Sequence, residues 1–357
     1  MDFRKLPSHN SELTKKNNTM ISSGLLSSTA FVPSTVLEGS RRCMVLMATY
    51  NGQAYLRPQI ESILRQSEVD VQILITDDCS SDHSFEIASE YASKDSRVYS
   101  RRNLTNKGVA NNFMSMIASI DPNSVDYVAF SDQDDVWLKD KLVTAVKAIN
   151  EKCSSTDAKK LSGIGTPILY CSDLQNVNEH LEESQLELKR LNIDLDHRAT
   201  PLLKNYFSGC TMVMNAAMVR LLQEYKGVVF PRIHDVWCSM VAYYCGNLVY
   251  DADHALILRR ITDNNTNGAI TAGKDIREAS LKHLAHASKR NISKSADLLY
   301  KTYSWAMSED DSALVGSFAN YRFSIISRLK WVFSPDYKAV TFGETMLLRT
   351  KILLGRL

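Results

Sequence analysis

Residues 43–78 read CMVLMATYNGQAYLRPQIESILRQSEVDVQILITDD. Two short apolar runs within this stretch, Cys43–Ala48 and Val71–Thr76, are typical of strands that are buried on both faces. Between them, apolar residues recur at helical spacing over Leu56–Leu64. A strand, a helix and a second strand in this order predict a right-handed crossover between two parallel strands.

The same alternation continues toward the C-terminus. The pattern predicts a helix over 85–92, a strand at Val98–Ser100, a helix over 113–120, a strand at Val125–Ser131 and a helix at Lys139–Asn150. Strands that alternate with helices of about a dozen residues indicate an α/β fold, with a mostly parallel central sheet flanked by helices.

The second half of the chain has a looser, mixed pattern. Strands are predicted at Ile168–Ser172, Thr211–Asn215, Leu248–Tyr250 and Ala255–Arg260, and helical segments within Leu174–Leu203 and at Ala216–Tyr225 and Val236–Cys245. Beyond about Gly268 the composition is mainly helical. We therefore expect a loosely ordered extension over 1–40, a catalytic domain over 41–268 and a helical, basic region over 269–357.

Composition and charge exclude several classes of protein. The 357 residues include 42 Lys or Arg and 40 Asp or Glu, a net charge of +2 that excludes a chain basic all over, so no nucleic-acid partner is expected. The charge is unevenly distributed, with +6 over 271–357 and −4 over 1–270. The sequence contains no apolar run long enough to span a bilayer, no signal peptide and no C-x-x-C pair among seven cysteines. A cytoplasmic protein with reduced thiols is expected.

Polar clusters follow three of the predicted strands: Thr49–Gly52, Asp77–Asp82 and Ser131–Asp135. Any one of them alone is compatible with ordinary turn chemistry. Ligands of open parallel sheets bind beyond the carboxyl ends of the strands, so three clusters at one edge favour a binding site. The sequence contains neither G-x-G-x-x-G nor a P-loop, which argues against a dinucleotide fold or a P-loop enzyme.

Asp132 and Asp134 form a D-x-D pair directly after a predicted strand. Unpaired carboxylates this close raise each other's pKa, and a hard cation such as Mg²⁺ or Mn²⁺ resolves the conflict by taking oxygen ligands and sharing them with phosphates. The alternative is a solvated acidic turn in which Asp134 or Asp135 caps a following helix. The pair Asp77–Asp78 suits a nucleoside, since carboxylates accept hydrogen bonds from a ribose hydroxyl or a pyrimidine N–H.

Seven motifs, taken in their order and spacing, carry a family resemblance over about Arg42–Gly268. They are VLMATYNGQAYLRPQIESILRQ, ILITDDCSSD, NKGVANNF, FSDQDDVW, SGCTMVMN, HDVW and LILRRITDNNTNGA. Together they resemble glycosyltransferase family 2, the inverting, sugar-nucleotide-dependent transferases of the GT-A fold, and in particular its rhamnosyltransferase-like branch. The resemblance implies a Rossmann-like nucleotide-binding half and a mixed acceptor half.

The resemblance also implies roles for individual residues. The implied sets are a nucleotide-binding set of Thr49, Tyr50, Asn51, Asp77, Asp78, Asn106, Gly108, Asp132, Arg259 and Arg260; metal ligands Asp132 and Asp134; an acceptor side of Gly209, Cys210, His234 and Trp237; and the general base Asp235. The alternative roles are an N-cap for Asp235 and a solvated strand edge for the two arginines. Thr262 stands where related sequences usually carry a histidine, which puts the metal dependence in question.

These observations predict an inverting glycosyltransferase that uses Mg²⁺ or Mn²⁺. It would move a sugar such as rhamnose from a UDP- or dTDP-type donor to a hydroxyl of a lipid-linked surface polysaccharide. The alternatives are a nucleotidyltransferase, or an inactive nucleotide-binding subunit of a polysaccharide assembly complex. Residues 314–357 combine apolar helical stripes with Lys and Arg, which predicts reversible contact with the inner face of the plasma membrane. A helix docked on the catalytic domain, or a dimer face, is the alternative.

Overall fold

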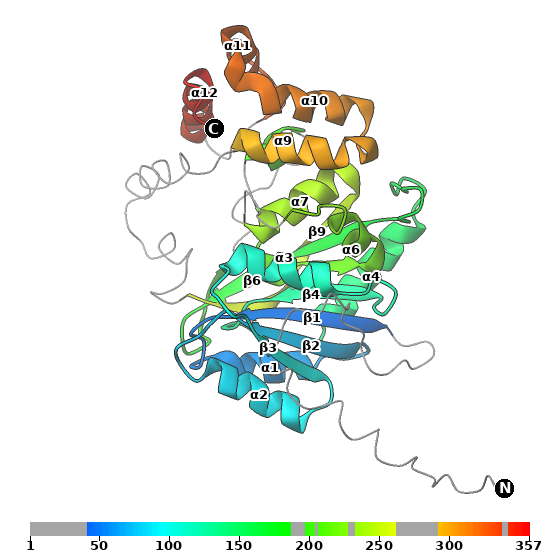
Figure 1. Cartoon of the computed structure of the whole chain (residues 1–357), viewed down its shortest axis with the longest axis vertical. Helices are drawn as coiled ribbons and strands as arrows, with labels where there is room; N and C mark the ends of the chain where they lie inside the picture. Colours follow the sequence, from blue (N-terminus) through cyan, green and yellow to red (C-terminus); the bar gives the residue numbers. More distant parts are fainter. Residues whose placement is uncertain (1–40, 187–196, 204–205, 228–232, 262–291, 338–341) are drawn as a thin grey trace, which may run out of the picture.

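The computed structural model describes residues 41–186, 197–203, 206–227, 233–261, 292–337 and 342–357 (Figure 1). Their strands form one nine-stranded mixed sheet in the order β3-β2-β1-β4-β8-β6-β9-β5, with β7 paired to β6. The strands are β1 Arg42–Thr49, β2 Asp70–Asp77, β3 Val98–Arg102, β4 Tyr127–Ser131, β5 Val136–Trp137, β6 Ile168–Val177, β7 Glu183–Leu186, β8 Val213–Asn215 and β9 Asn247–Arg260. An α/β fold with a mostly parallel sheet was predicted, and the structure confirms it.

The first half follows the predicted alternation closely. Strands β1 to β4 are parallel, and they are connected by α1 (Leu56–Leu64), α2 (Ser84–Lys94) and α3 (Val109–Ser119); α4 (Lys141–Ser154) follows β5. Strand β1 pairs with β2 and β4 along its two edges, and helices cover both of its faces. Met44 and Leu46 pack into the core beneath α3, whereas Cys43, Val45 and Met47 pack into the core beneath α1 and α4.

The second half differs from the prediction in two places. The two short strands expected at Leu248–Tyr250 and Ala255–Arg260 are one strand, β9, whose register against β6 shifts around Asp173. Within Leu174–Leu203, the described residues form the end of β6, the strand β7 and the short helix α5 (Thr200–Leu203), and part of the range predicted to hold a charged helical segment lies outside the described residues. Residues 175–177 pair with β9, so β6 extends beyond the strand predicted at Ile168–Ser172.

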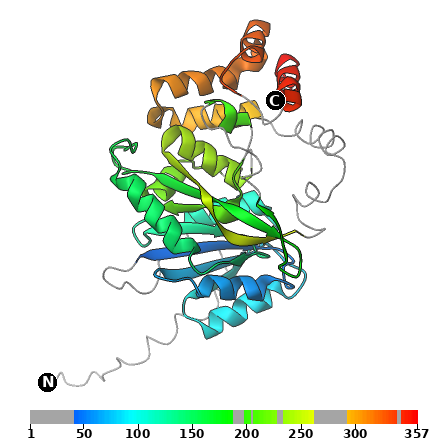
Figure 2. The same ribbon diagram turned by 180° about the vertical axis from the view of Figure 1, so that it is seen from behind.

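The C-terminal helices pack on α7 (His234–Cys245), which lies between them and the sheet (Figures 1 and 2). They are α9 Ile292–Tyr303, α10 Glu309–Asn320, α11 Ile325–Val332 and α12 Phe342–Leu353. Leu299, Tyr303 and Phe318 belong to the same core cluster as Met44 and Phe113, so the helices continue the core of the sheet. The division at residue 268 stays a prediction, and the extension over 1–40 lies outside the described residues. Among the described residues, no helix has the length and apolar composition that crossing a bilayer requires.

Candidate active site

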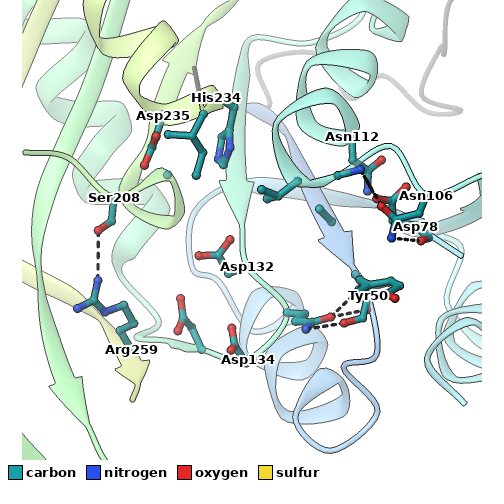
Figure 3. Close-up of a pocket in the computed structure, with 18 of the residues that line it drawn as sticks. Tyr50, Asp78, Asn106, Asn112, Asp132, Asp134, Ser208, His234, Asp235 and Arg259 are labelled. Carbon is teal, nitrogen blue, oxygen red and sulfur yellow. Dashed lines mark hydrogen bonds between the residues drawn. The ribbon is translucent and has the colours of Figure 1, made fainter. Parts of the chain in front are cut away.

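A cavity of about 470 Å³ opens at the carboxyl ends of β1 and β4 (Figure 3). This is the edge at which the sequence places its polar clusters, because parallel strands end on the same side of a sheet. Its wall is formed by the ends of β1 and β2, the loop before α3 and the first turn of α3, the acidic run after β4, the segment before β8, the start of α7 and the end of β9. The polar lining residues are Thr49, Tyr50, Asp78, Asn106, Asn112, Asp132, Gln133, Asp134, Asp135, Ser208, His234, Asp235 and Arg259.

Gln133 ties the acidic run to the end of β1. Its Oε1 accepts hydrogen bonds from Thr49 Oγ1 at 2.7 Å and from Tyr50 N at 2.8 Å, and its Nε2 donates to Tyr50 O at 3.1 Å. The amide lies so close to Gly52 that a Cβ there would fall 2.1 Å from Oε1. Half of Tyr50 remains exposed at the cavity, so its ring is available to a ligand.

Asp78 organises the rim of the cavity next to the end of β1, where its N donates to Thr49 O at 2.8 Å. Its carboxylate accepts hydrogen bonds from Asn103 Nδ2 at 2.8 Å, Lys107 N at 2.9 Å and Gly108 N at 2.8 Å. Gly108 has a φ of +75°, a left-handed conformation that glycine adopts without a steric penalty. Asn106 Nδ2 donates to Asp78 O at 3.1 Å. Asp78 therefore shapes the loop that faces a ligand, in addition to lining the cavity itself.

The acidic run is held between two strands. Asp132–Asp135 connects β4 to β5, and β5 pairs antiparallel with β9 at Val136 and Leu258. That pairing brings the run beside Arg259, whose Nε donates to Asn176 Oδ1 at 2.9 Å and whose Nη1 donates to Ser208 Oγ at 3.4 Å.

The carboxylates of the run are crowded and largely out of water. Burial, and then the charges of Asp134 and Asp235, raise the pKa of Asp132 to about 7, against an opposing effect of Arg259. Burial also raises the pKa of Asp134, and it raises that of Asp135 well above the ordinary value. Asp135 is 1% exposed, and its Oδ2 has no hydrogen-bond partner among the described residues.

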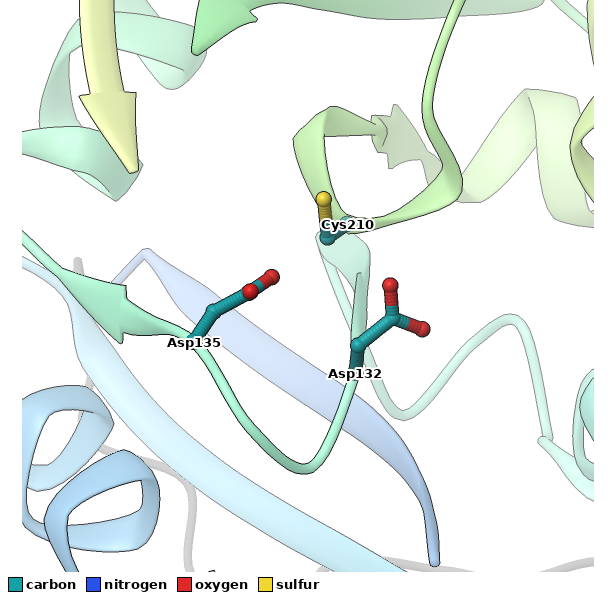
Figure 4. A group of neighbouring side chains, drawn as sticks. All are labelled: Asp132, Asp135 and Cys210. Atoms are coloured by element: carbon teal, nitrogen blue, oxygen red, sulfur yellow. The ribbon is translucent and has the colours of Figure 1, made fainter. Parts of the chain in front are cut away.

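Asp132, Asp135 and Cys210 offer ligand atoms that all lie within 4.8 Å of one another (Figure 4). Burial raises the pKa of the Cys210 thiol well above its ordinary value, so the thiol stays protonated. The two carboxylates are hard oxygen donors, and the unpartnered Asp135 oxygen suits a divalent cation of the Mg²⁺ or Mn²⁺ kind. The donor set therefore fits such an ion, with Asp134 lining the same cavity.

The opposite wall is the N-terminus of α7. Figure 3 shows Asp132 lying between Asp134 on one side and Asp235 on the other. Asp235 is 8% exposed, lies in the first turn of α7 and accepts a hydrogen bond from Val236 N at 2.6 Å. A carboxylate in the first turn interacts favourably with the helix dipole, so Asp235 also stabilises α7.

His234 is buried between α3 and the segment before β8. Its ring stacks on Phe113 with centroids 4.1 Å apart, and a Cβ on Gly209 would fall 2.4 Å from its Nε2. Burial lowers the pKa of His234 to about 3, so the imidazole is neutral. Neither ring nitrogen has a hydrogen-bond partner among the described residues, although the ring lines the cavity.

Comparison with known proteins relates part of the chain to a family. The model of "Glycosyl transferase family 2" matches residues 44–217. The match covers just under half of the chain, and over these residues the chain is similar to glycosyltransferase family 2. The matched region supplies the β1 end, the Asp78 loop and the acidic run.

Curated relatives match part of the chain only. A "dTDP-rhamnosyl transferase RfbG" of Shigella flexneri is 37% identical over 116 residues, which are 31% of this chain and 40% of the relative. A "Putative teichuronic acid biosynthesis glycosyltransferase TuaG" of Bacillus subtilis is 31% identical over 127 residues, 35% of this chain and 49% of the relative. The chain thus spans less than half the length of these two relatives.

Two solved structures are similar in fold to most of the chain. Residues 1–349 of S. aureus TarS in complex with UDP align with a TM-score of 0.53 and 15% identity, over 88% of this chain and 87% of that one. The complex of the same protein with UDP-GlcNAc aligns with a TM-score of 0.51 and 16% identity, over 83% and 77%. At these identities the likeness extends to the fold alone.

The cavity brings together most of the residues that the sequence singles out. The lining includes Thr49, Tyr50, Asp78, Asn106, Gly108, Asp132, Asp134, Gly209, His234, Asp235 and Arg259. Their ligand-binding and catalytic roles stay predictions.

Five predicted residues are not among the lining residues. Asp77 is fully buried and lies 3.3 Å from Arg102 Nε, while Asn51 Oδ1 accepts from Ser81 N at 2.8 Å. Arg260 Cζ lies 5.0 Å from the centroid of the Tyr55 ring, and the Cys210 thiol lies within 4.8 Å of an Asp135 carboxylate oxygen. Trp237 packs between Tyr225 and Tyr303. They support the lining residues of the site from outside. Thr262 lies outside the described residues.

The structure also adds residues that the sequence analysis did not select. Gln133, Asp135 and Ser208 line the cavity. Asp135 was considered only as a helix cap, whereas it precedes the strand β5. The apolar pair Val136–Trp137 after the acidic run is the signal that indicates this strand, since a strand directs alternate side chains to opposite faces.

Proposed function

We propose that the chain is an inverting glycosyltransferase that moves a sugar from a nucleotide-diphosphate donor to an acceptor hydroxyl. One observation carries the proposal: a single cavity has Asp134 and Arg259 along one side, Asp235 on the other and Asp132 between them. Displacement with inversion requires this separation, because the leaving group and the attacking hydroxyl lie on opposite faces of the anomeric carbon.

The donor nucleotide would bind between Tyr50 and the Asp78 loop. The half-exposed Tyr50 ring offers a surface for the base, and Asn106 and Gly108 line the rim beside the base or ribose. Arg259 would neutralise charge on the diphosphate, as its guanidinium is the cationic group of the described lining.

Asp132 and Asp135 would hold a divalent cation, with Asp134 beside them. Such an ion, when bound, supplies Lewis-acid stabilisation of the charge that develops on the departing diphosphate. The chain's own part is to keep these carboxylates together, and the Gln133 bonds to the β1 end hold the loop that carries them.

Asp235 would act as the general base. Its carboxylate accepts the proton of the acceptor hydroxyl while the hydroxyl oxygen forms a bond to the anomeric carbon. The bond from that carbon to the diphosphate oxygen breaks, and the nucleoside diphosphate leaves with the electron pair. The neutral ring of His234, adjacent in the chain, has ring nitrogens available to hydrogen-bond the acceptor.

The finer proposal is transfer of rhamnose from a dTDP-type donor to a lipid-linked surface polysaccharide such as lipopolysaccharide, on the cytoplasmic side of the membrane. The partial similarity to a dTDP-rhamnosyl transferase and to a teichuronic acid glycosyltransferase supports it. UDP-sugars remain the competing donor class.

Two measurements test the proposal. A thermal-shift panel of UDP, dTDP and GDP, each with and without Mn²⁺, should show stabilisation by one nucleotide; no stabilisation by any of them would contradict every nucleotide-dependent function. Nucleotide release with a lipid-linked acceptor pool should then fall at least 10³-fold in Asp235→Asn, roughly the upper range for loss of a general base, while nucleotide binding is retained.

The matched control is Asp310→Asn. Asp310 also lies in the first turn of a helix, α10, but it is exposed and far from the cavity lining. It removes the same kind of helix-dipole interaction and should leave nucleotide release unchanged. Retained turnover in Asp235→Asn would exclude this residue as the base, and nucleotide binding without release in the wild type would favour an inactive binding subunit.

A further inference from the structure

The outward side of α11 is apolar. Ile325, Ile326, Leu329 and Phe333 fall within about 100° of arc on a helical projection, at positions i, i+1, i+4 and i+8. Ile326 is 76% exposed and Phe333 is 75% exposed. The helix therefore presents its hydrophobic stripe to solvent.

The other side of α11 explains this orientation. Trp331, about 140° away from Ile326, is buried. Its ring packs edge-on against Phe318 with centroids 4.8 Å apart, and its Nε1 donates to Ser317 Oγ at 3.2 Å. Trp331 thus docks α11 on α10, while Ile325, Ile326, Leu329 and Phe333 stay exposed.

A second apolar stripe lies on α12, which packs against α11. Phe342, Met346 and Leu353 fall within about 40° of arc, and Phe342 is 81% exposed. Buried Ile352 attaches this helix to the rest of the chain. Both views place the two helices together at the end of the molecule opposite α1 and α2 (Figures 1 and 2). We call the two stripes together the C-terminal apolar face.

Basic residues accompany this face. Residues 321–357 contain seven Lys or Arg and two Asp or Glu, a net charge of +5. Lys330 is exposed one turn after Ile326, so it belongs to the same side of α11 as the apolar stripe.

We propose that the C-terminal apolar face docks on an anionic membrane surface. Apolar side chains inserted among the headgroups, with Lys and Arg held at the phosphates, form the pattern of helices that lie in a membrane interface. A second copy of this chain is a poorer occupant, because a symmetric contact would bring together two copies of a segment whose net charge is +5. This inference rests on α11 and α12 and is independent of the function proposed for the cavity.

The test is flotation of the full chain with phosphatidylcholine vesicles, with and without phosphatidylglycerol. We expect binding that requires phosphatidylglycerol and weakens at high salt, since exposed charges are screened. Ile326→Glu/Phe333→Glu should weaken binding at least tenfold. Leu104→Glu is the matched control: Leu104 is 81% exposed but follows β3, away from the C-terminal face, and its substitution should leave binding unchanged.

The milder pair Ile326→Ser/Phe333→Ser covers the case in which the glutamates disturb folding, and it should also weaken binding. No binding of the wild-type chain to vesicles that contain phosphatidylglycerol would overturn the proposal. An equal loss of vesicle binding in Leu104→Glu would also overturn it. Concentration-dependent dimers that the double variants abolish, without vesicle binding, would identify a second copy as the occupant instead.

Discussion

Neutralising Asp132 should stabilise the metal-free protein, and the size of the effect follows from its surroundings. The carboxyl is held in a crowded, buried run, and its pKa is raised from 3.8 to about 7. A pKa rise of this size lowers the free energy of unfolding of the wild type by about 4 kcal/mol above pH 7. Asp132→Asn removes this charge and also relieves the carboxylates of Asp134 and Asp135.

The pH dependence of this prediction has a definite sign. At pH 3 both the folded and the unfolded chain carry a protonated Asp132, and the variant gains nothing. Between pH 4 and 7 the unfolded carboxyl ionises while the folded one keeps its proton, so the wild type loses stability as pH rises. The advantage of Asp132→Asn therefore grows from about pH 4 and reaches its full value above about pH 7.

The assay is the melting temperature in EDTA from pH 4.5 to 8, at a fixed scan rate. At about 2 °C per kcal/mol for a chain of this size, the variant should melt up to about 8 °C above the wild type at pH 8, and no more than about 2 °C above it at pH 4.5. Asp253→Asn, an exposed carboxylate on β9, is the control and should change neither value. A lower melting temperature for Asp132→Asn at pH 8 would refute the assignment of a repulsive, buried cluster.

Three further predictions concern single contacts. Gly209→Ala should destabilise the chain by about 1–3 kcal/mol in chemical denaturation, since its methyl group would fall 2.4 Å from the pinned ring of His234; an unchanged midpoint would show that the ring can move. Asp78→Ala removes one of the two acceptors of Gly108 N, and it should weaken nucleotide binding about tenfold by calorimetry. An unaltered affinity would contradict this role. Burial lowers the pKa of Lys141 to about 8, so Lys141→Met should raise the free energy of unfolding by about 1–3 kcal/mol at pH 6. This gain should fade between pH 8 and 10.5, and a gain that grows with pH would contradict the prediction.

The first half of the fold was predictable because its local patterns agree with its tertiary contacts. Strand β1 is a continuous apolar run that is buried on both faces, and α1 has one apolar stripe. In β9 the local pattern and the tertiary contacts disagree, since the polar stretch Asp251–His254 interrupts the strand pattern without ending the strand. Half-exposed positions leave the side-chain pattern weak, and only the pairing with β6 shows that the strand continues.

The residues of the site also include some that the sequence predicts and some that it does not. Asp132 and Asp134 were predictable from their place after β4, a local feature. Asp135 and Gln133 were not, because their roles depend on distant partners. Asp135 is buried through the two-residue strand β5 and its pairing with β9, about 120 residues away along the chain. Gln133 gains its role from Thr49 and from the space left by Gly52.

The charge of the cavity links its two proposed ligands. Among the described residues that line it, five aspartates face one arginine, Arg259. A nucleoside diphosphate is itself an anion, and entering this cavity alone it would add charge to a site whose carboxylates already raise one another's pKa. A divalent cation at Asp132 and Asp135 would offset the negative charge of the cavity and so favour binding of the nucleotide. The nucleotide would in turn add oxygen ligands for the cation. By linkage, each must then strengthen the binding of the other by the same factor. The acidic run is thus costly in the empty protein for the same reason that it would make donor binding depend on the metal.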